Sequence, residues 1–230
     1  MAMELPSLNT SRMARRQLHV ILALDCSGSM TGDKIASLNY AMRAAIPEMR
    51  AAADDNPETD VLVRVLRFST QVEWHVAAPT PVGRFEWQDV VAGGETNMGE
   101  ALATIADILG PERMPGRQLP PVVVLVSDGQ PSDDFEAGLK RLFDSPYGGR
   151  ALRVAIAIGS DADNEILERF IAHPDFKPLR ANNAQDLVNR IKWATTAPVK
   201  SVSSPTNAPD PVTQLARDAE RQSRSSDMVW

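Results

Sequence analysis

The chain has 230 residues, a single cysteine and a formal net charge of −6. This length permits one domain with a large core and additional tails. One cysteine excludes an intramolecular disulfide and any metal site built from several cysteines. The negative charge argues against a dedicated nucleic-acid-binding protein, because neutralising phosphates requires a basic face.

No apolar run approaches the roughly 20 residues that a membrane-spanning helix needs. Three arginines, Arg12, Arg15 and Arg16, precede a short apolar segment that Asp25 interrupts. Because this segment also lacks a cleavage-site pattern, we expect no secretory signal and a cytoplasmic protein.

The first half of the chain predicts two strands around a helix. Residues 1–16 are polar without periodicity, so we expect a flexible N-terminal arm. A nearly continuous apolar run at 18–24 is typical of a strand buried in a parallel sheet, and residues 61–68 predict a second strand. Apolar residues at helical spacing predict a helix from 33 to 53.

A hairpin and a long loop follow the second strand. Residues 72–76 predict a short edge strand that pairs antiparallel with 61–68. Residues 79–95 carry Pro79, Pro81 and three glycines, so we expect a long loop there. Long loops in compact domains are often functional.

The second half continues the alternation of strands and helices. We expect a helix from Met98, with Asn97 and Glu100 spaced as a capping pair. The remaining expected strands lie at 122–126, 152–158 and 176–180, each followed by a helix. The order predicts one doubly wound α/β domain over residues 17–196. Its sheet is mostly parallel, with one antiparallel edge strand and helices on both faces.

The composition changes at the C-terminal end. Residues 197–230 are rich in serine, threonine and proline and poor in apolar groups, which is typical of a disordered tail. A short polar helix at 213–222 is compatible with the sequence.

Oxygen-bearing side chains cluster where the first strand ends. Asp25, Ser27 and Ser29 occupy alternate positions directly after the apolar run. Short side chains at this spacing can converge on one point in a turn that contains glycine. Hard divalent cations such as Mg²⁺ prefer oxygen ligands of this kind. The turn therefore predicts part of a metal site.

Two further segments supply oxygens at the same sheet edge. Asp128 follows the strand at 122–126, and Thr96 lies in a loop that two glycines, Gly93 and Gly94, allow to approach closely. Ligands of open α/β sheets bind beyond the carboxyl ends of the strands, near the switch in strand order. We therefore expect five hard oxygen donors to meet there: Asp25, Ser27, Ser29, Thr96 and Asp128.

These segments resemble the three parts of a metal-ion-dependent adhesion site. The parts are Asp25-x-Ser27-x-Ser29, the Gly94-Glu95-Thr96 loop leading into Gly99-x-Ala101-Leu102, and Ser127-Asp128-Gly129. In this order they mark the von Willebrand factor type A domain, and the resemblance covers roughly residues 16–195. The resemblance implies Mg²⁺, with Mn²⁺ or Ca²⁺ as other candidates. Ser27, Ser29 and Thr96 would bind it directly, and Asp25 and Asp128 directly or through waters. An open coordination position would take a carboxylate from a partner protein.

Within this family the chain is similar to the bacterial tellurium-resistance TerY-like group. The similarity lies in the N-terminal arm, the Phe68-Ser69 hairpin and the Ser/Thr/Pro tail. It implies an adaptor in a stress-type system that works with a Ser/Thr protein kinase and a phosphatase. Tail hydroxyls such as Ser201, Ser203 and Ser204 are then phosphorylation candidates.

An enzyme and a purely structural metal are the alternatives. Asp25 as a covalent nucleophile for Mg²⁺-dependent phosphoryl transfer would require a second acid two residues on, and that residue is Ser27. The sequence also places no lysine near Thr96 or Asp128, and no G-x-S-x-G elbow follows the first strand. We therefore expect a protein that is not an enzyme. A structural metal would predict that Asp25→Ala unfolds the domain.

Other polar residues have ordinary structural explanations. Aspartate and serine after strands also serve as helix caps and turn formers, as we expect for Asp133, Asp134, Asp161 and Asp163. We expect Cys26 to point into the packing rather than to react. The histidines show no ligand spacing, and Trp74 and Trp87 are expected to cover the core or the sheet edge.

Overall fold

The computed structural model describes residues 15–202 and 217. The expected arm up to residue 14 and most of the expected tail lie outside these residues. The described chain forms a six-stranded sheet in the order β3-β2-β1-β4-β5-β6. The strands are β1 (Arg16–Asp25), β2 (Thr59–Phe68), β3 (Val72–Pro81), β4 (Val122–Ser127), β5 (Leu152–Ile158) and β6 (Leu179–Ala181).

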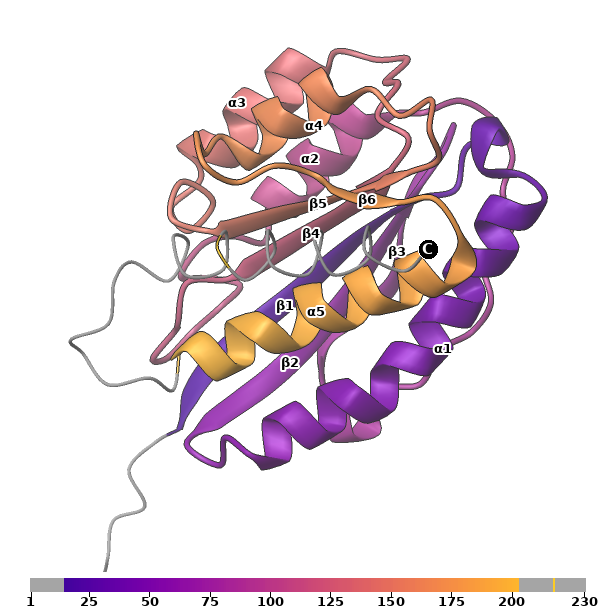
Figure 1. The fold of residues 1–230 in the computed structure, drawn as a ribbon. Coiled ribbons are helices and arrows are strands. Elements are labelled where there is room, and N and C mark those ends of the chain that lie inside the picture. The colour runs from indigo at the N-terminus through magenta and orange to yellow at the C-terminus, as the bar shows by residue number, and fades with distance from the viewer. Residues whose placement is uncertain (1–14, 203–216, 218–230) are drawn as a thin grey trace, which may run out of the picture.

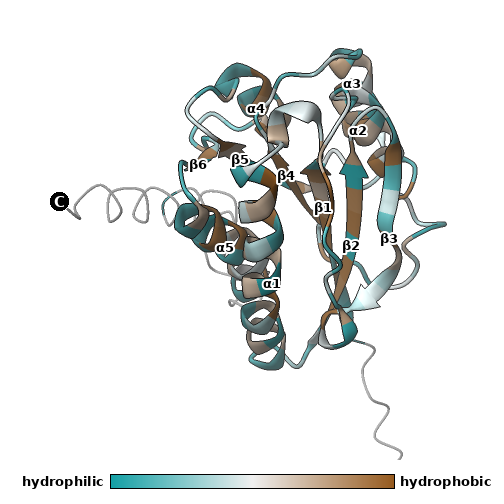
Figure 2. Ribbon diagram, turned by 90° about the vertical axis from the view of Figure 1, so that its right-hand side faces the viewer, coloured by the Kyte–Doolittle hydropathy of each residue, from teal (hydrophilic) through white to brown (hydrophobic). Residues whose placement is uncertain are grey.

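Helices cover both faces of the sheet (Figures 1 and 2). One face carries α1 (Asp33–Asp54) and α5 (Ala184–Val202). The other face carries α2 (Met98–Ala106), α3 (Phe135–Asp144) and α4 (Asn164–Ile171). All neighbouring strands are parallel except β2 and β3. The predicted doubly wound α/β fold with one antiparallel edge is confirmed.

The central strands are buried because helices shield both of their faces. Val20 to Leu24 of β1 and Val123 to Val126 of β4 have no exposed surface. Their continuous apolar sequences reflect this position, since a strand covered on both sides has no polar face. Figure 2 shows these strands in brown between the two helix layers.

The edge strand β3 is longer than we expected. It runs from Val72 to Pro81, so the predicted loop at 79–95 begins after the strand and contains a short 3₁₀ turn, η2 (Val82–Arg84). Leu62 pairs with Pro81 and Val63 with Thr80, beyond a register shift in the ladder. Proline is compatible with an edge strand, because its missing N–H is not needed on the unpaired side.

The last two elements also differ from the expectation. The short edge strand occupies Leu179–Ala181 rather than 176–180. Phe176 lies outside it and is buried, with its ring centroid 6.0 Å from that of Trp193. The helix α5 includes Pro198 and runs to Val202, past the expected domain end at residue 196.

The strand order reverses between β1 and β4. The chain leaves β1 through α1 on one face of the sheet, and the helix α3 after β4 lies on the other face (Figure 1). The carboxyl ends of β1 and β4 lie side by side, because Leu24 pairs with Val126. A crevice at such a reversal is where doubly wound sheets bind ligands.

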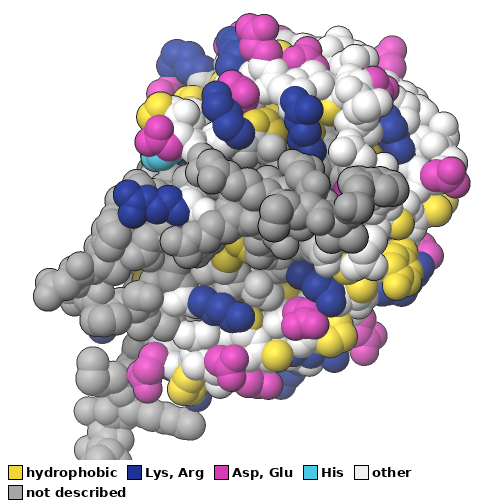
Figure 3. Space-filling view, in the orientation of Figure 1, with side chains coloured by type: hydrophobic (Ala, Val, Ile, Leu, Met, Phe, Trp, Pro, Cys, Tyr) yellow, Lys and Arg dark blue, Asp and Glu magenta, His cyan; other side chains and the backbone are white. Residues whose placement is uncertain are grey.

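The described surface carries charges of both signs. On the face shown in Figure 3, basic and acidic side chains are interspersed over the helices. None of the described helices combines the length and the apolar character needed to cross a membrane.

Candidate functional site

The turn after β1 fixes the first three candidate side chains. Asp25 has no exposed surface, and its Oδ1 accepts a hydrogen bond of 2.8 Å from the backbone N–H of Ser27. The hydroxyls of Ser27 and Ser29 lie 3.0 Å apart at the start of a 3₁₀ turn, η1 (Gly28–Met30). Ser27 is buried whereas Ser29 is exposed. The turn therefore joins a buried carboxylate to the protein surface.

The glycine loop that precedes α2 is bonded directly to this turn. The N–H of Gly93 donates to the carbonyl of Cys26 at 2.8 Å, and that of Gly28 to the carbonyl of Gly94 at 2.9 Å. Gly94 has a φ of 86°, and a Cβ built on it would lie 2.3 Å from Thr70 Oγ1. A side chain at Gly94 would therefore push the loop away from the turn between β2 and β3, whereas a Cβ on Gly93 would meet no atom within 4 Å.

The end of β4 approaches the same turn through a side-chain hydrogen bond. Ser127 Oγ donates to Asp25 Oδ2 at 2.6 Å and accepts from the N–H of Gly129 at 2.8 Å. The next residue, Asp128, is 2% exposed. Its Oδ1 has no hydrogen-bond partner among the described residues, and its Oδ2 lies 3.5 Å from Lys34 Nζ.

Thr96 is tied to the loop that follows β4. Its N–H donates to Ser132 Oγ at 2.9 Å, and its carbonyl accepts from the N–H of Ser132 at 2.9 Å. Thr96 is itself 8% exposed. Three loops that are distant in the sequence thus carry all five candidate residues to one edge of the sheet.

The expected capping pair of α2 was wrong. Asn97 precedes the helix but makes no cap hydrogen bond, and its amide Nδ2 donates to the carbonyl of Thr70 instead. The cap comes from the next loop, where Asp133 accepts from the N–H groups of Gly99 and Glu100 at 2.8 Å each. Asp133 therefore fixes the helix that begins just after Thr96.

The site concentrates negative charge away from water. Burial raises the pKa of Asp25, while hydrogen bonds from Ser127 and Ser27 oppose this rise and the charge of Asp128 adds to it. In the described chain, Lys34 is the one cation that forms an ion pair with either carboxylate. Two buried carboxylates with a single cationic neighbour form a site that is suited to a cation.

The donor set fits a hard cation rather than a soft one. No three His, Cys, Asp or Glu side chains come together as a metal cluster in the described part of the chain. The candidate donors are instead two carboxylates and three hydroxyls, the oxygen chemistry that suits Mg²⁺, Mn²⁺ or Ca²⁺. The partnerless Oδ1 of Asp128 is an oxygen that such an ion would satisfy.

Sequence reasoning missed two side-chain contacts at this site, one from Lys34 and one from Ser127. The expectation that no lysine lies near Asp128 was wrong, because Lys34 reaches it from the first turn of α1, 94 positions away in the chain. No local spacing could have indicated this contact. The role of Ser127 could have been inferred, since a serine at the last position of β4 lies beside the end of β1.

The other polar residues have structural partners. Asp134 and Asp163 cap α3 and α4 through their carboxylates, as expected. Cys26 is buried, and burial raises the pKa of its thiol to about 12. His19 Nδ1 lies 3.0 Å from the Arg64 guanidinium, and the ring of His75 lies 5.0 Å from that of Trp87.

A doubly wound sheet with an oxygen-lined site at its switch point defines a class of ligand-binding α/β domains. The family model of the von Willebrand factor type A domain matches residues 19–190. The chain therefore belongs to the von Willebrand factor type A domain family, whose members are generally metal-dependent protein-interaction modules. A comparison with curated protein sequences gives no match.

Solved structures share the fold at low sequence identity. A von Willebrand factor type A protein from Catenulispora acidiphila has a TM-score of 0.59 and 19% identity, and covers 80% of this chain and 43% of its own. The ArnB paralog VWA2 from Sulfolobus acidocaldarius has a TM-score of 0.55 and 18% identity, and the match covers 76% of this chain and 44% of that protein. The pilus adhesin SpaC from Lactobacillus rhamnosus GG, in an open conformation, has a TM-score of 0.64 and 14% identity. The match covers 80% of this chain and 30% of that protein. This chain thus spans less than half of each of these three structures.

Proposed function

We propose that this protein is a metal-dependent protein-interaction module whose metal is Mg²⁺, with Mn²⁺ and Ca²⁺ as other candidates. The ion would be held by the five residues named above, from the loops after β1, before α2 and after β4. The observation that carries the proposal is the buried Oδ1 of Asp128, which has no partner among the described residues. Such an oxygen is costly unless a proton donor or a cation reaches it.

The bound ion would supply a Lewis-acidic centre with room for one further oxygen ligand. The chain's own residues support this arrangement from two sides. On the buried side, Ser127 Oγ donates a hydrogen bond of 2.6 Å to Asp25 Oδ2 and holds this carboxylate in place. On the other side, Ser29 lies at the protein surface. A carboxylate of a partner protein is the ligand that would match a cation at this surface.

The motif resemblance to the TerY-like group supports a narrower proposal. On this proposal the protein is a cytoplasmic bacterial adaptor of a tellurium-resistance or stress-type system, and its partners include a Ser/Thr kinase and a phosphatase. The proposal rests on the arm, the Phe68-Ser69 hairpin and the composition of the tail. Most of the tail and most of the arm lie outside the described residues.

The structure supplies one group that the enzyme alternative requires, a lysine, but its candidate nucleophile, Asp25, is not accessible. Lys34 supplies the cation that a phosphoryl-transfer site would need. Asp25, however, has no exposed surface, and both of its oxygens already accept hydrogen bonds. A nucleophile must reach its substrate, so we propose a binding protein rather than an enzyme. Mg²⁺-dependent phosphatase turnover that is lost in Asp25→Asn would reverse this ranking.

A metal that only ties the loops together is the second alternative. The loops already have direct hydrogen bonds to one another, from Gly28 to Gly94 and between Thr96 and Ser132. These bonds support a fold that does not depend on the ion. Loss of the folded state in EDTA would favour the structural alternative.

Affinity capture from the native host, with and without EDTA, tests the proposed interaction. We expect a partner band that requires Mg²⁺ and is absent with Asp128→Asn. The matched control is Asp144→Asn, which removes an exposed carboxylate paired with Lys140 at the far end of α3. The same band in EDTA, or with both variants, would contradict the metal-dependent interaction. A kinase or phosphatase in the band would support the TerY-like assignment.

A further inference from the structure

Lys34 lies between two carboxylates of very different environments. Its Nζ is 3.5 Å from Asp128 Oδ2 and 3.4 Å from Asp161 Oδ1. The Asp128 side chain is 3% exposed, whereas that of Asp161 is 67% exposed. The ammonium group is therefore shared between a buried candidate metal ligand and a carboxylate in water.

The geometry around Lys34 leaves room for its side chain to shift. Lys34 and Asp161 both line a hollow of about 730 Å³ between α1 and the turn before α5. The pair lies over Gly159, on which a Cβ would be 2.6 Å from Asp161 Oδ1 and 3.1 Å from Lys34 Cε. The Lys34 side chain is 24% exposed. It can thus move toward Asp161 without crossing packed core.

We propose that Lys34 is a built-in counter-cation that competes with the divalent ion for Asp128 and moves its ion pair to Asp161 when the ion binds. The inference rests on the proposed metal site. Before loading, Lys34 compensates part of the charge of the two buried carboxylates. After loading, the divalent ion takes over this compensation and repels the ammonium group, and Asp161 receives it. The residue thereby lowers the site's affinity for the metal and stabilises the metal-free protein.

Lys34→Met should have opposite effects on two quantities, the affinity for Mg²⁺ and the Tm of the metal-free protein. We expect Mg²⁺ to bind about tenfold more tightly, because the competing cation is gone. We also expect the Tm in EDTA to fall by about 4 °C, because Asp128 then has no cationic partner. A residue with a purely structural role would lower the Tm without tightening Mg²⁺ binding.

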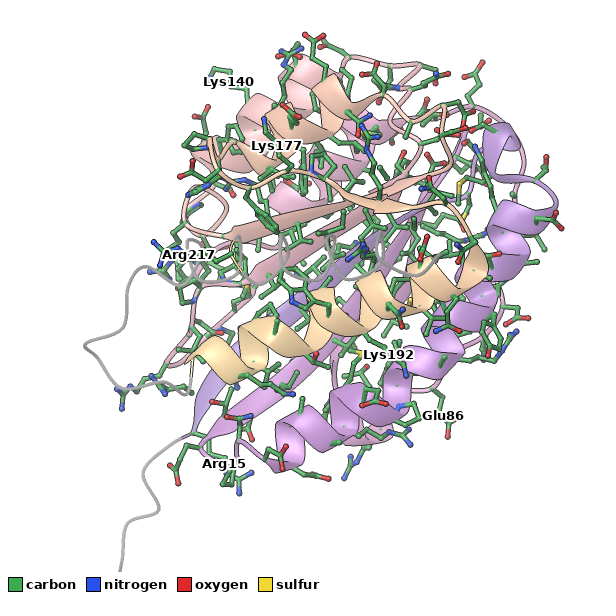
Figure 4. All side chains as sticks on the ribbon, viewed as in Figure 1. Arg15, Glu86, Lys140, Lys177, Lys192 and Arg217 are labelled. Carbon is green, nitrogen blue, oxygen red and sulfur yellow. The ribbon has the colours of Figure 1, made fainter. Side chains whose placement is uncertain are left out.

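Lys192→Met is the matched control. Lys192, labelled in Figure 4, lies on α5 and pairs at 3.2 Å with Glu48 of α1, and its side chain is 32% exposed. Glu48 is about 20 Å along α1 from Lys34. This variant removes a similar lysine ion pair, so its Mg²⁺ affinity should equal that of the wild type.

Asp161→Asn tests whether Asp161 receives the Lys34 ammonium group when the metal binds. In the wild-type background it should weaken Mg²⁺ binding about threefold, because Lys34 then has no alternative partner. In the Lys34→Met background its effect should be much smaller. Equal effects in both backgrounds would mean that Asp161 acts only as a nearby negative charge, and would overturn the exchange.

The closing experiment is calorimetric titration of Mg²⁺ into the full chain, with Tm values measured in EDTA, for the wild type and these variants. Tighter binding together with a lower Tm in Lys34→Met supports the proposal. Unchanged binding in Lys34→Met overturns the role of Lys34 and leaves the proposed metal site intact. If neither the wild type nor Lys34→Met binds Mg²⁺, both the proposed metal site and this inference fail.

Discussion

Ser127 donates a hydrogen bond of 2.6 Å to Asp25 Oδ2 and thereby links the ends of the two strands between which the sheet order reverses. The same hydroxyl accepts from the N–H of Gly129, so it also shapes the turn that carries Asp128. One buried hydroxyl therefore orients both candidate carboxylate ligands, although it is not a candidate ligand itself.

Ser127→Ala should weaken both the fold and metal binding. The change leaves a carboxylate oxygen and a backbone N–H without their partner, which costs about 1–3 kcal/mol of unfolding free energy. Mg²⁺ affinity should fall at least several-fold, because Asp25 loses its fixed orientation. Urea unfolding and Mg²⁺ titration measure the two effects.

Ser145→Ala is the control for this prediction. Ser145 Oγ likewise donates to one group, the carbonyl of Leu142, and accepts from another, the N–H of Gly148. This variant should lose stability without losing Mg²⁺ affinity. A similar drop in Mg²⁺ affinity for both variants would mean that Ser127 has no specific role at the site.

Ser29→Ala should separate metal binding from folding. Ser29 is exposed and its hydroxyl bonds to Ser27 Oγ, so removing it should lower the unfolding free energy by about 1 kcal/mol at most. We expect Mg²⁺ to raise the Tm of the wild type but to raise that of Ser29→Ala much less, because a ligand stabilises only through binding. Thermal melts at increasing Mg²⁺ concentration check this. An identical Mg²⁺ response in both proteins would remove Ser29 from the ligand set.

His19 should make stability depend on pH in the mildly acidic range. Burial, with the charge of Arg64 in addition, lowers the pKa of His19 from 6.5 to about 4. Between these values the unfolded chain binds a proton that the folded protein does not, so stability falls as the pH drops from about 6.5 toward 4. The full loss from this group is about 3 kcal/mol.

His19→Gln should reduce this pH dependence, because glutamine does not titrate, and its amide oxygen can still accept a hydrogen bond from Arg64. Urea unfolding between pH 4 and pH 7 measures the slopes of the two proteins. Equal slopes in the wild type and His19→Gln would show that His19 is not the responsible group.

Cys26 should resist thiol reagents in the folded protein. The residue is 3% exposed, and burial raises the pKa of its thiol to about 12, so the reactive thiolate is scarce at pH 8. Because the sequence has one cysteine, any reaction with a thiol reagent reports on Cys26 alone. We expect one thiol to react with a disulfide reagent in denaturant and almost none in buffer. Rapid labelling of the native protein would contradict this placement.

Much of the fold could be predicted because the local sequence determines it. The apolar runs of β1, β4 and β5 are continuous because helices cover both faces of the sheet, so the strands were recognisable from composition alone. The alternation with helices then predicted the doubly wound topology. The same topology predicted that the turn after Asp25 and the turn at Asp128 meet at one edge.

The remaining details depend on contacts that local patterns do not contain. Pro79 and Pro81 indicated a loop, but an edge strand tolerates them. Asn97 was expected to cap α2, yet Asp133 does so from another loop. Lys34 reaches Asp128 from across the switch point. Each of these features depends on a tertiary contact between segments that are not adjacent in the local sequence pattern.

The central claim is that Asp25, Ser27, Ser29, Thr96 and Asp128 hold a divalent cation. Anomalous diffraction from crystals grown with Mn²⁺ tests it most directly, because Mn²⁺ prefers the same oxygen ligands as Mg²⁺ and scatters anomalously. We predict a strong peak bounded by the loops after β1, before α2 and after β4, and no such peak for Asp128→Asn. A Mn²⁺ peak elsewhere, or no peak at this edge in the wild type, would contradict the account.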